Sequence, residues 1–513
     1  MKIRRSLAGA LAVGMAAAAL SACANPAGSG GDSDTATVIL GVEATRGLDP
    51  AVIGTFTPSG DANRMSAIYG ALFWADAATG KVNPGLGESL TTGDGEHWTM
   101  RLRPDLRFSD GTALDAEAVK FNYERHADPA THSTQQDAAK GLKMKVDDPR
   151  TLEITLPEAN RQFDRTIAKN LTYIASPTAI RKEGKDFTNR PVGAGPFMLK
   201  DWVRDDHMTL VRNPNYWEKG RPYLKTVIIK PIADPVQRIN TVASGQAQIA
   251  VPGSELSFKK RAEQSGLAVT DAPAGGGPML IFNTKSGPFA DKRARQAVAY
   301  ALNPDDLVKV VDPGSTAPKG VLADNSPFFD ASTPLPRNDP AKAQQLLNTI
   351  AADGKPLKFA LTVPASGFFR KTAEYIQSRL SSLRNVTVQV DTVDNATLTQ
   401  RVFRDKDFQA SVQIVPVTDP EPDLFNLLHS DGITNQMSYH SAAMDQALEK
   451  GRSATDEAGR KGAYADMQRI LATDVPIYPY RNQDAYTVHG KSVSGITLYG
   501  EGALLFDRLR VGK

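Results

Sequence analysis

Histidine, cysteine and serine are the side chains that would carry metal or nucleophilic chemistry, and their spacing here matches no such site. No two histidines stand at the H-x-x-x-H spacing that places two imidazoles on one helix face, and no cysteine lies near them. No serine occupies a G-x-S-x-G turn, the nucleophile position of many hydrolases. The sequence therefore predicts no metal site, no cofactor and no enzyme activity. The histidines are His97, His126, His132, His207, His429, His440 and His489.

Phosphate-binding and acid–base patterns are equally incomplete. Gly490-Lys491-Ser492 looks like the end of a phosphate loop, but the glycine required five positions before Gly490 is Ala485. The acidic pairs Asp147-Asp148 and Asp305-Asp306 lie beside proline, as turn and helix-start residues do. We interpret these carboxylates as solvated rather than catalytic.

The first 23 residues have the layout of a bacterial secretory signal. A basic start is followed by the uncharged apolar run 7–20, which is too short to span a bilayer as a helix. Without the three basic residues of this signal, 57 basic residues face 57 acidic ones, so the mature chain is formally neutral. Neutrality argues against a nucleic-acid partner and against electrostatic membrane binding.

Cys23 is the only cysteine, and it ends the sequence Leu20-Ser21-Ala22-Cys23. This sequence resembles the bacterial lipobox, in which the cysteine is lipidated and becomes the mature N-terminus. Cleavage after Ala24 at an A-x-A site is the alternative. Lipidation predicts a protein anchored by its acyl chains, palmitate among them, to the outer face of the cell membrane, with residues 24–34 as a flexible tether.

Alternating helices and strands must position any binding site in the remaining chain. Apolar residues at helical spacing, caps and β-branched runs predict helices near 64–73, 115–123, 294–302 and 373–383, and strands at 34–42, 97–106, 151–156, 208–212, 226–231 and 386–390. Asn303 and Pro304 end one helix and begin the next. This alternation predicts an α/β fold. The breaker cluster at 275–278 is either a crossing between lobes or an ordinary surface turn.

Six motifs in order resemble a known family, the extracytoplasmic solute-binding proteins of peptide and nickel ABC importers (solute-binding family 5). They lie at Tyr69–Phe73, Gly85–Ser89 with Trp98–Arg103, Phe108–Thr112, Val192–Phe197, Asn213–Trp217, and Phe282–Thr284 with Pro288-Phe289. The resemblance covers nearly all of the mature chain. Most of these aromatic residues are expected to pack in cores.

The resemblance implies a two-lobe periplasmic-binding-protein-like fold with an inserted extra subdomain in the first lobe. Lobe I would comprise 35–54, 188–277 and the C-terminal return 481–513, with the insertion at 55–187 and lobe II at 278–480. The lobes would close by hinge motion on a solute and present it to the membrane permease.

The family anchors a peptide's amino terminus with an aspartate in a W-x-x-D segment, and the matching stretch here is 414–425. The tryptophan is missing, and the register places the anchor at Thr418, beside Asp419, or at Pro416. Asp419 is either this anchor or a turn acid. Further candidates carried over by position are Glu43, Ala44, Thr45, Asn435 and Tyr480, each with packing or capping as the alternative; Arg401 and Arg404 are candidates for a ligand carboxylate or are solvated.

The resemblance therefore implies a monomeric substrate-binding lipoprotein of an ABC importer that captures extracellular peptides. The missing tryptophan keeps an alternative open, in which the same fold binds a nickel chelate, a sugar or another small molecule. The absence of paired histidines argues against a bare metal ion.

Overall fold

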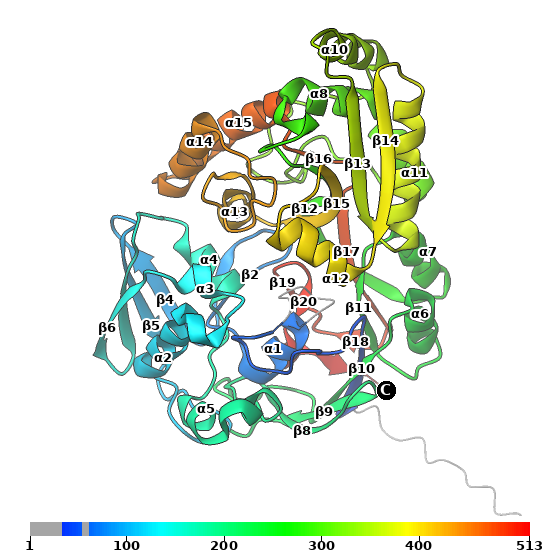
Figure 1. The fold of residues 1–513 in the computed structure, drawn as a ribbon. Coiled ribbons are helices and arrows are strands. Elements are labelled where there is room, and N and C mark those ends of the chain that lie inside the picture. Colours follow the sequence, from blue (N-terminus) through cyan, green and yellow to red (C-terminus); the bar gives the residue numbers. More distant parts are fainter. Residues whose placement is uncertain (1–32, 54–60, 513) are drawn as a thin grey trace, which may run out of the picture.

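The computed structural model describes residues 33–53 and 61–512, so Cys23 and nearly all of the predicted tether lie outside the described residues. Its central feature is an eleven-stranded mixed sheet that runs through both lobes (Figure 1). The strand order is β14-β13-β15-β12-β17-β11-β1-β10-β9-β8, and β16 also pairs with β12. The strands are β1 (Thr35–Leu40), β8 (Phe197–Val203), β9 (His207–Arg212), β10 (Thr226–Pro231), β11 (Ile249–Gly253), β12 (Ala268–Phe282), β13 (Leu357–Pro364), β14 (Val386–Val393), β15 (Ala410–Val417), β16 (Ile477–Pro479) and β17 (Gln483–His489).

Helices cover this sheet and build the second lobe beyond it (Figure 1). In lobe I they are α6 (Pro235–Ala243), α7 (Leu256–Gln264) and α1 (Ala62–Tyr69), which falls within the range predicted for the insertion but packs in the core of lobe I. In lobe II they are α8 (Lys292–Ala301), α9 (Pro304–Val311), α10 (Pro340–Ala352), α11 (Gly367–Ser381), α12 (Asn395–Leu398), α13 (Phe425–Leu428), α14 (Ala442–Ser453) and α15 (Glu457–Asp474). None of the helices in the described part of the chain has the length and apolar character needed to cross a membrane.

The inserted subdomain is built on its own four-stranded antiparallel sheet, in the order β4-β5-β7-β6 (Figure 1). Its elements are β2 (Phe73–Ala75), β3 (Val82–Pro84), β4 (Gly87–Thr92), β5 (His97–Leu102), α2 (Ala116–Ala127), α3 (Gln136–Ala139), β6 (Lys143–Asp148), β7 (Thr151–Thr155), α4 (Phe163–Asn170) and α5 (Pro177–Glu183). Four short strands near the C-terminus return to lobe I: β18 (Val493–Ser494), β19 (Leu498–Tyr499), β20 (Ala503–Leu504) and β21 (Arg510–Val511).

Three large hydrophobic cores hold these parts together. The core of lobe II contains residues between Met279 and Tyr480. The core of lobe I combines residues from the range 36–272 with residues 485–511 of the C-terminal return. The core of the insertion lies within 72–194. This is the predicted α/β architecture of two lobes with an insertion. The exact limits predicted for the domains stay predictions.

The glycine cluster at 275–278 lies inside the buried strand β12 and not in a surface turn. Residues 268–274 of β12 pair with β17, whereas residues 275–282 pair with β15, so the strand changes partners there. Gly276 and Gly277 have φ values of 69° and 95°, and a Cβ on Gly276 would lie 2.1 Å from the carbonyl oxygen of Val415. Side chains are excluded at this crossing because the backbone is left-handed and closely packed.

Local signals explain the predicted elements. Asp115 accepts a hydrogen bond from the backbone N–H of Ala118 at 2.9 Å and caps α2, and Asn303 and Pro304 begin α9 as predicted. The helix expected over 64–73 is wrong at its end. It stops at Tyr69 because Gly70 has a φ of 65°, and Phe73 belongs to strand β2.

A buried histidine in the insertion makes the stability of the protein depend on pH. His126 is 3% exposed, its Nδ1 lies 2.7 Å from the hydroxyl of Ser133, and burial together with the charge of Arg125 lowers its pKa to about 4, despite the opposing charge of Asp49. In the unfolded chain the imidazole of His126 takes up a proton near pH 6.5, whereas in the folded chain it does so only near pH 4. Stability is therefore lost as the pH falls from 6.5 to 4, by up to about 3 kcal/mol.

We expect His126→Gln to flatten this part of the pH profile. Urea unfolding at pH 7, 6, 5 and 4.5 should show a smaller loss of stability for the variant than for the unmodified chain. His132→Asn is the control, because His132 is exposed and asparagine tolerates its positive φ. Parallel pH profiles for His126→Gln and the unmodified chain would contradict this prediction.

Candidate ligand-binding site

A cavity of about 680 Å³ lies between the inserted subdomain and lobe II, and we call it the interlobe cavity. On the side of the insertion, the turn between β2 and β3 and the start of α4 line this cavity. From lobe II come the end of β15, the start of α15 and the loop at 322–328. The lining residues are 77–82, 162, 164–165, 275, 322–323, 325–328, 417–419, 454–457 and 460.

A smaller deep pocket of about 60 Å³ adjoins the interlobe cavity. The two share Gly80, Arg165, Thr418 and Asp419, together with Ala77. The deep pocket is also lined by α4, by Tyr173 after it, and by residues 499–501 of the C-terminal return to lobe I. All three parts of the molecule therefore meet at this point.

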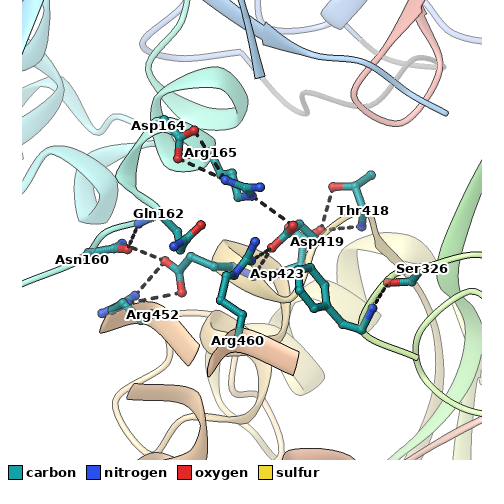
Figure 2. A network of polar contacts seen from close by, with 12 residues as sticks. Asn160, Gln162, Asp164, Arg165, Ser326, Thr418, Asp419, Asp423, Arg452 and Arg460 are labelled. Carbon is teal, nitrogen blue, oxygen red and sulfur yellow. Dashed lines mark hydrogen bonds and ion pairs between the residues drawn. The ribbon is translucent and has the colours of Figure 1, made fainter. Parts of the chain in front are cut away.

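Asp419 lies at the centre of the polar network that crosses the cavity (Figure 2). Its Oδ2 accepts from Nε of Arg165 at 3.0 Å and its Oδ1 from Nη2 of Arg460 at 2.6 Å, one arginine from the insertion and one from lobe II. The backbone N–H of Glu421 donates to the same carboxylate at 3.0 Å. Burial would lower the pKa of Arg165, but the charges of Asp419 and Asp164 outweigh it and raise that pKa. Asp419 is thus paired with two cations, one from each side of the cavity.

Two further contacts join the insertion to the acidic segment 419–423. Nζ of Lys169 donates to Oδ1 of Asp423 at 2.6 Å, and Nδ2 of Asn160 donates to Oε1 of Glu421 at 3.0 Å. Lys169 also pairs with Glu501 at 3.1 Å. The charges of Asp423 and Glu501 raise the pKa of Lys169 against the opposing effect of burial. The lobes are therefore linked by charged contacts that a conformational change must exchange.

Thr418 and Asp419 are the two predicted site residues that line the interlobe cavity. The backbone N–H and the hydroxyl of Thr418 both donate to Oδ2 of Asp423, at 2.8 and 3.1 Å. Asp419 also caps the turn that begins at Pro420, so the two predicted roles, anchor and turn acid, are compatible in one side chain.

The other predicted residues lie outside this lining. Glu43 accepts from the indole N–H of Trp202 in lobe I, and Thr45 is exposed. The amide of Asn435 is bonded to the backbone of His429 and Tyr439. The hydroxyl of Tyr480 is buried and donates to Thr372 at 3.3 Å. Glu43, Asn435 and Tyr480 therefore have packing or capping contacts, and ligand contact by any of the four residues stays a prediction. The same holds for Ala44, which is buried, Arg401, which pairs with Asp391, and Arg404.

The basic residues Arg165, Lys169 and Arg460 were not found by sequence reasoning. The one local signal for them is the acidic segment Asp419-Pro420-Glu421-Pro422-Asp423. Carboxylates this close together need cationic partners when they are buried, as Glu421 and Asp423 are. Their partners on α4 stand about 250 residues away in the sequence. Among the residues that the structure describes, no group of three histidine, cysteine, aspartate or glutamate side chains could hold a metal ion.

Comparison with known proteins agrees with this architecture. The glutathione-binding protein GsiB of Shigella flexneri is 28% identical over 457 residues, covering 86% of this chain and 88% of that protein. The ABC transporter-associated periplasmic binding protein DppA of Helicobacter pylori, solved with the peptide STSA, superposes with a TM-score of 0.80 at 21% identity, covering 94% and 99% of the two chains. AgaA of A. tumefaciens R10, solved with agropinic acid, gives 0.78 at 23% identity, covering 93% and 98%.

The model of the bacterial extracellular solute-binding proteins, family 5, matches residues 81–435, about two thirds of the chain. The match includes most of the insertion and most of lobe II, and therefore residues from both sides of the interlobe cavity. This protein belongs to the bacterial extracellular solute-binding proteins, family 5.

Proposed function

We propose that this protein captures extracellular peptides in the interlobe cavity and delivers them to the permease of an ABC importer. The observation that carries the proposal is Asp419, a carboxylate on the cavity wall between two arginines. A peptide with free termini brings one ammonium and one carboxylate, and it can exchange with these ion pairs without leaving a charge unpaired. A volume of about 680 Å³ is in the usual range of small-molecule sites.

Closure on the ligand follows from the placement of the cavity. Residues from the insertion and from lobe II line opposite walls, so a ligand that contacts both walls binds the closed form better than the open form. That differential affinity shifts the population towards closure. The permease would recognise the closed form, because only closure brings the surfaces of both lobes into one arrangement.

A lipid on Cys23 would hold the monomer at the outer face of the cell membrane, where the importer can receive the peptide. Glutathione is itself a short peptide, and the similarity to glutathione-binding relatives supports this class of ligand.

A non-peptide solute is the second candidate. Position 415, three residues before Thr418, is valine where the peptide binders have tryptophan, and Asp419 is engaged by two arginines. A structural relative solved with agropinic acid shows that this fold accommodates such a ligand.

Thermal unfolding in the presence of defined ligands distinguishes a peptide from a non-peptide solute. We expect tri-alanine or glutathione at about 100 times its Kd to stabilise the delipidated protein by about 2.7 kcal/mol. N-acetyl-tri-alanine amide, which lacks both charged termini, is the control and should give no shift. A molecule that co-purifies and is identified by mass spectrometry as a non-peptide, together with no shift for any peptide, would favour the second candidate.

A further inference from the structure

Lobe I and the insertion enclose another cavity, of about 250 Å³, which we call the rear cavity. It shares no lining residue with the interlobe cavity or the deep pocket. Segments far apart in the sequence line it: the end of α1 with β2, residues 84–86 with Arg103, Pro196, the loop after β9, and the segment before the C-terminus. The proposed function gives it no task.

Aromatic and aliphatic side chains form part of its walls, beside charged ones. Trp74, Tyr216 and Trp217 line it together with Leu86 and Leu505. Trp74 is 9% exposed, and Trp217 is partly exposed. Such walls suit a flat apolar body that buries ring surface against them.

Two arginines in the lining have no carboxylate partner in the described part of the chain. Nε of Arg103 donates to the carbonyl oxygen of Gly85 at 2.6 Å, and its guanidinium lies 4.4 Å from the centre of the Trp217 ring. The guanidinium of Arg508 lies 5.3 Å from the ring of Trp74. Cation–π contacts of this kind fix the arginines and leave most of their N–H groups free to donate.

The two acids that line the rear cavity share one arginine partner. Glu218 and Asp507 both pair with Arg221, at 3.0 and 3.2 Å. Tyr216 also hydrogen-bonds to Asp507. Three arginines therefore face two carboxylates, and the local charge is positive.

Arg508 also carries a buried donor with no acceptor. Its Nε has no hydrogen-bond partner among the described residues. This atom is out of reach from the cavity, but the guanidinium itself lines the cavity, and a planar carboxylate is the anion that matches its fork. The free donors, the positive charge and the aromatic side chains point to the same class of ligand.

We infer that the rear cavity is a second binding site, for a small carboxylic acid with a flat apolar body. The carboxylate pairs with Arg508 and Arg103, and the body packs against Trp74 and Trp217. A volume of about 250 Å³ limits the ligand to about the size of a single substituted ring.

Benzoate is the probe, and benzamide is its uncharged counterpart of the same shape. Tryptophan fluorescence reports binding, because two of the four tryptophans line the rear cavity and none lines the interlobe cavity. We expect saturable quenching by benzoate in the mature chain, confirmed by calorimetry, and binding by benzamide at least about tenfold weaker.

Arg508→Gln and Arg103→Gln should each weaken benzoate binding at least about tenfold, with tri-alanine binding unchanged. Arg181→Gln is the matched control, because Arg181 lies 4.7 Å from the ring of Phe121 in the same kind of contact but outside the cavity. Equal affinity for benzoate and benzamide would overturn the inference. So would displacement of benzoate by tri-alanine, or unchanged affinity in both arginine variants.

Discussion

Asp419→Asn is expected to abolish the discrimination between a peptide with a free amino terminus and its acetylated form. In the unmodified protein the carboxylate of Asp419 would exchange Arg165 for the ligand ammonium, whereas an acetylated terminus offers no charge. Loss of a buried charge pair at an interface costs about 2 kcal/mol or more, which is about 30-fold in Kd. Calorimetry with tri-alanine and N-acetyl-tri-alanine on both proteins measures this coupling directly.

Asp456→Asn is the matched control for that experiment. Asp456 lines the same cavity and caps α15 by accepting from the backbone N–H of Gly459 at 2.7 Å. Asparagine caps a helix about as well, so this variant removes a charge from the wall and leaves the fold intact. Equal discrimination by the Asp419→Asn and Asp456→Asn variants would mean that Asp419 is a turn acid and not the amine anchor.

Arg481→Met is expected to lower the free energy of unfolding by about 3–5 kcal/mol. Arg481 is 1% exposed, and its Nη1 donates to Asp312 at 2.9 Å and to the carbonyl oxygen of Ser254 at 2.7 Å. These contacts tie the chain segment between β16 and β17 to α9 of lobe II and to the start of α7 in lobe I. Removal of the cation leaves the carboxylate of Asp312 buried without its charge partner.

Denaturant unfolding, followed by tryptophan fluorescence and circular dichroism, measures this loss. Arg469→Met is the control, because Arg469 pairs with Asp466 on the exposed side of α15 and such pairs contribute about 1 kcal/mol at most. The double variant Arg481→Met with Asp312→Asn should recover part of the loss, since it removes the unpaired charge. If Arg481→Met loses no more stability than Arg469→Met, the ion pair between Arg481 and Asp312 contributes little to the free energy of unfolding.

The sequence by itself determined the local structure of this protein, because the signals lie within a few residues of each other. Asp115 caps α2 by a hydrogen bond to a residue three positions away, and Asn303 with Pro304 sets the start of α9. Ordered motifs also identified the family and its two-lobe α/β fold. The end of α1 was missed because Gly70 takes a left-handed φ that the apolar spacing around it does not reveal.

Only the tertiary structure decided which polar residues meet across the cavity. Asp419 and Arg165 are 254 positions apart, and the packing of the insertion against lobe II brings them together. The same packing leaves Glu43 and Asn435 bonded within their own lobes, although their places in the sequence match ligand-facing positions of the family. The role of a charged side chain depends on its partners, and here the packing of the insertion and the two lobes against each other determines those partners.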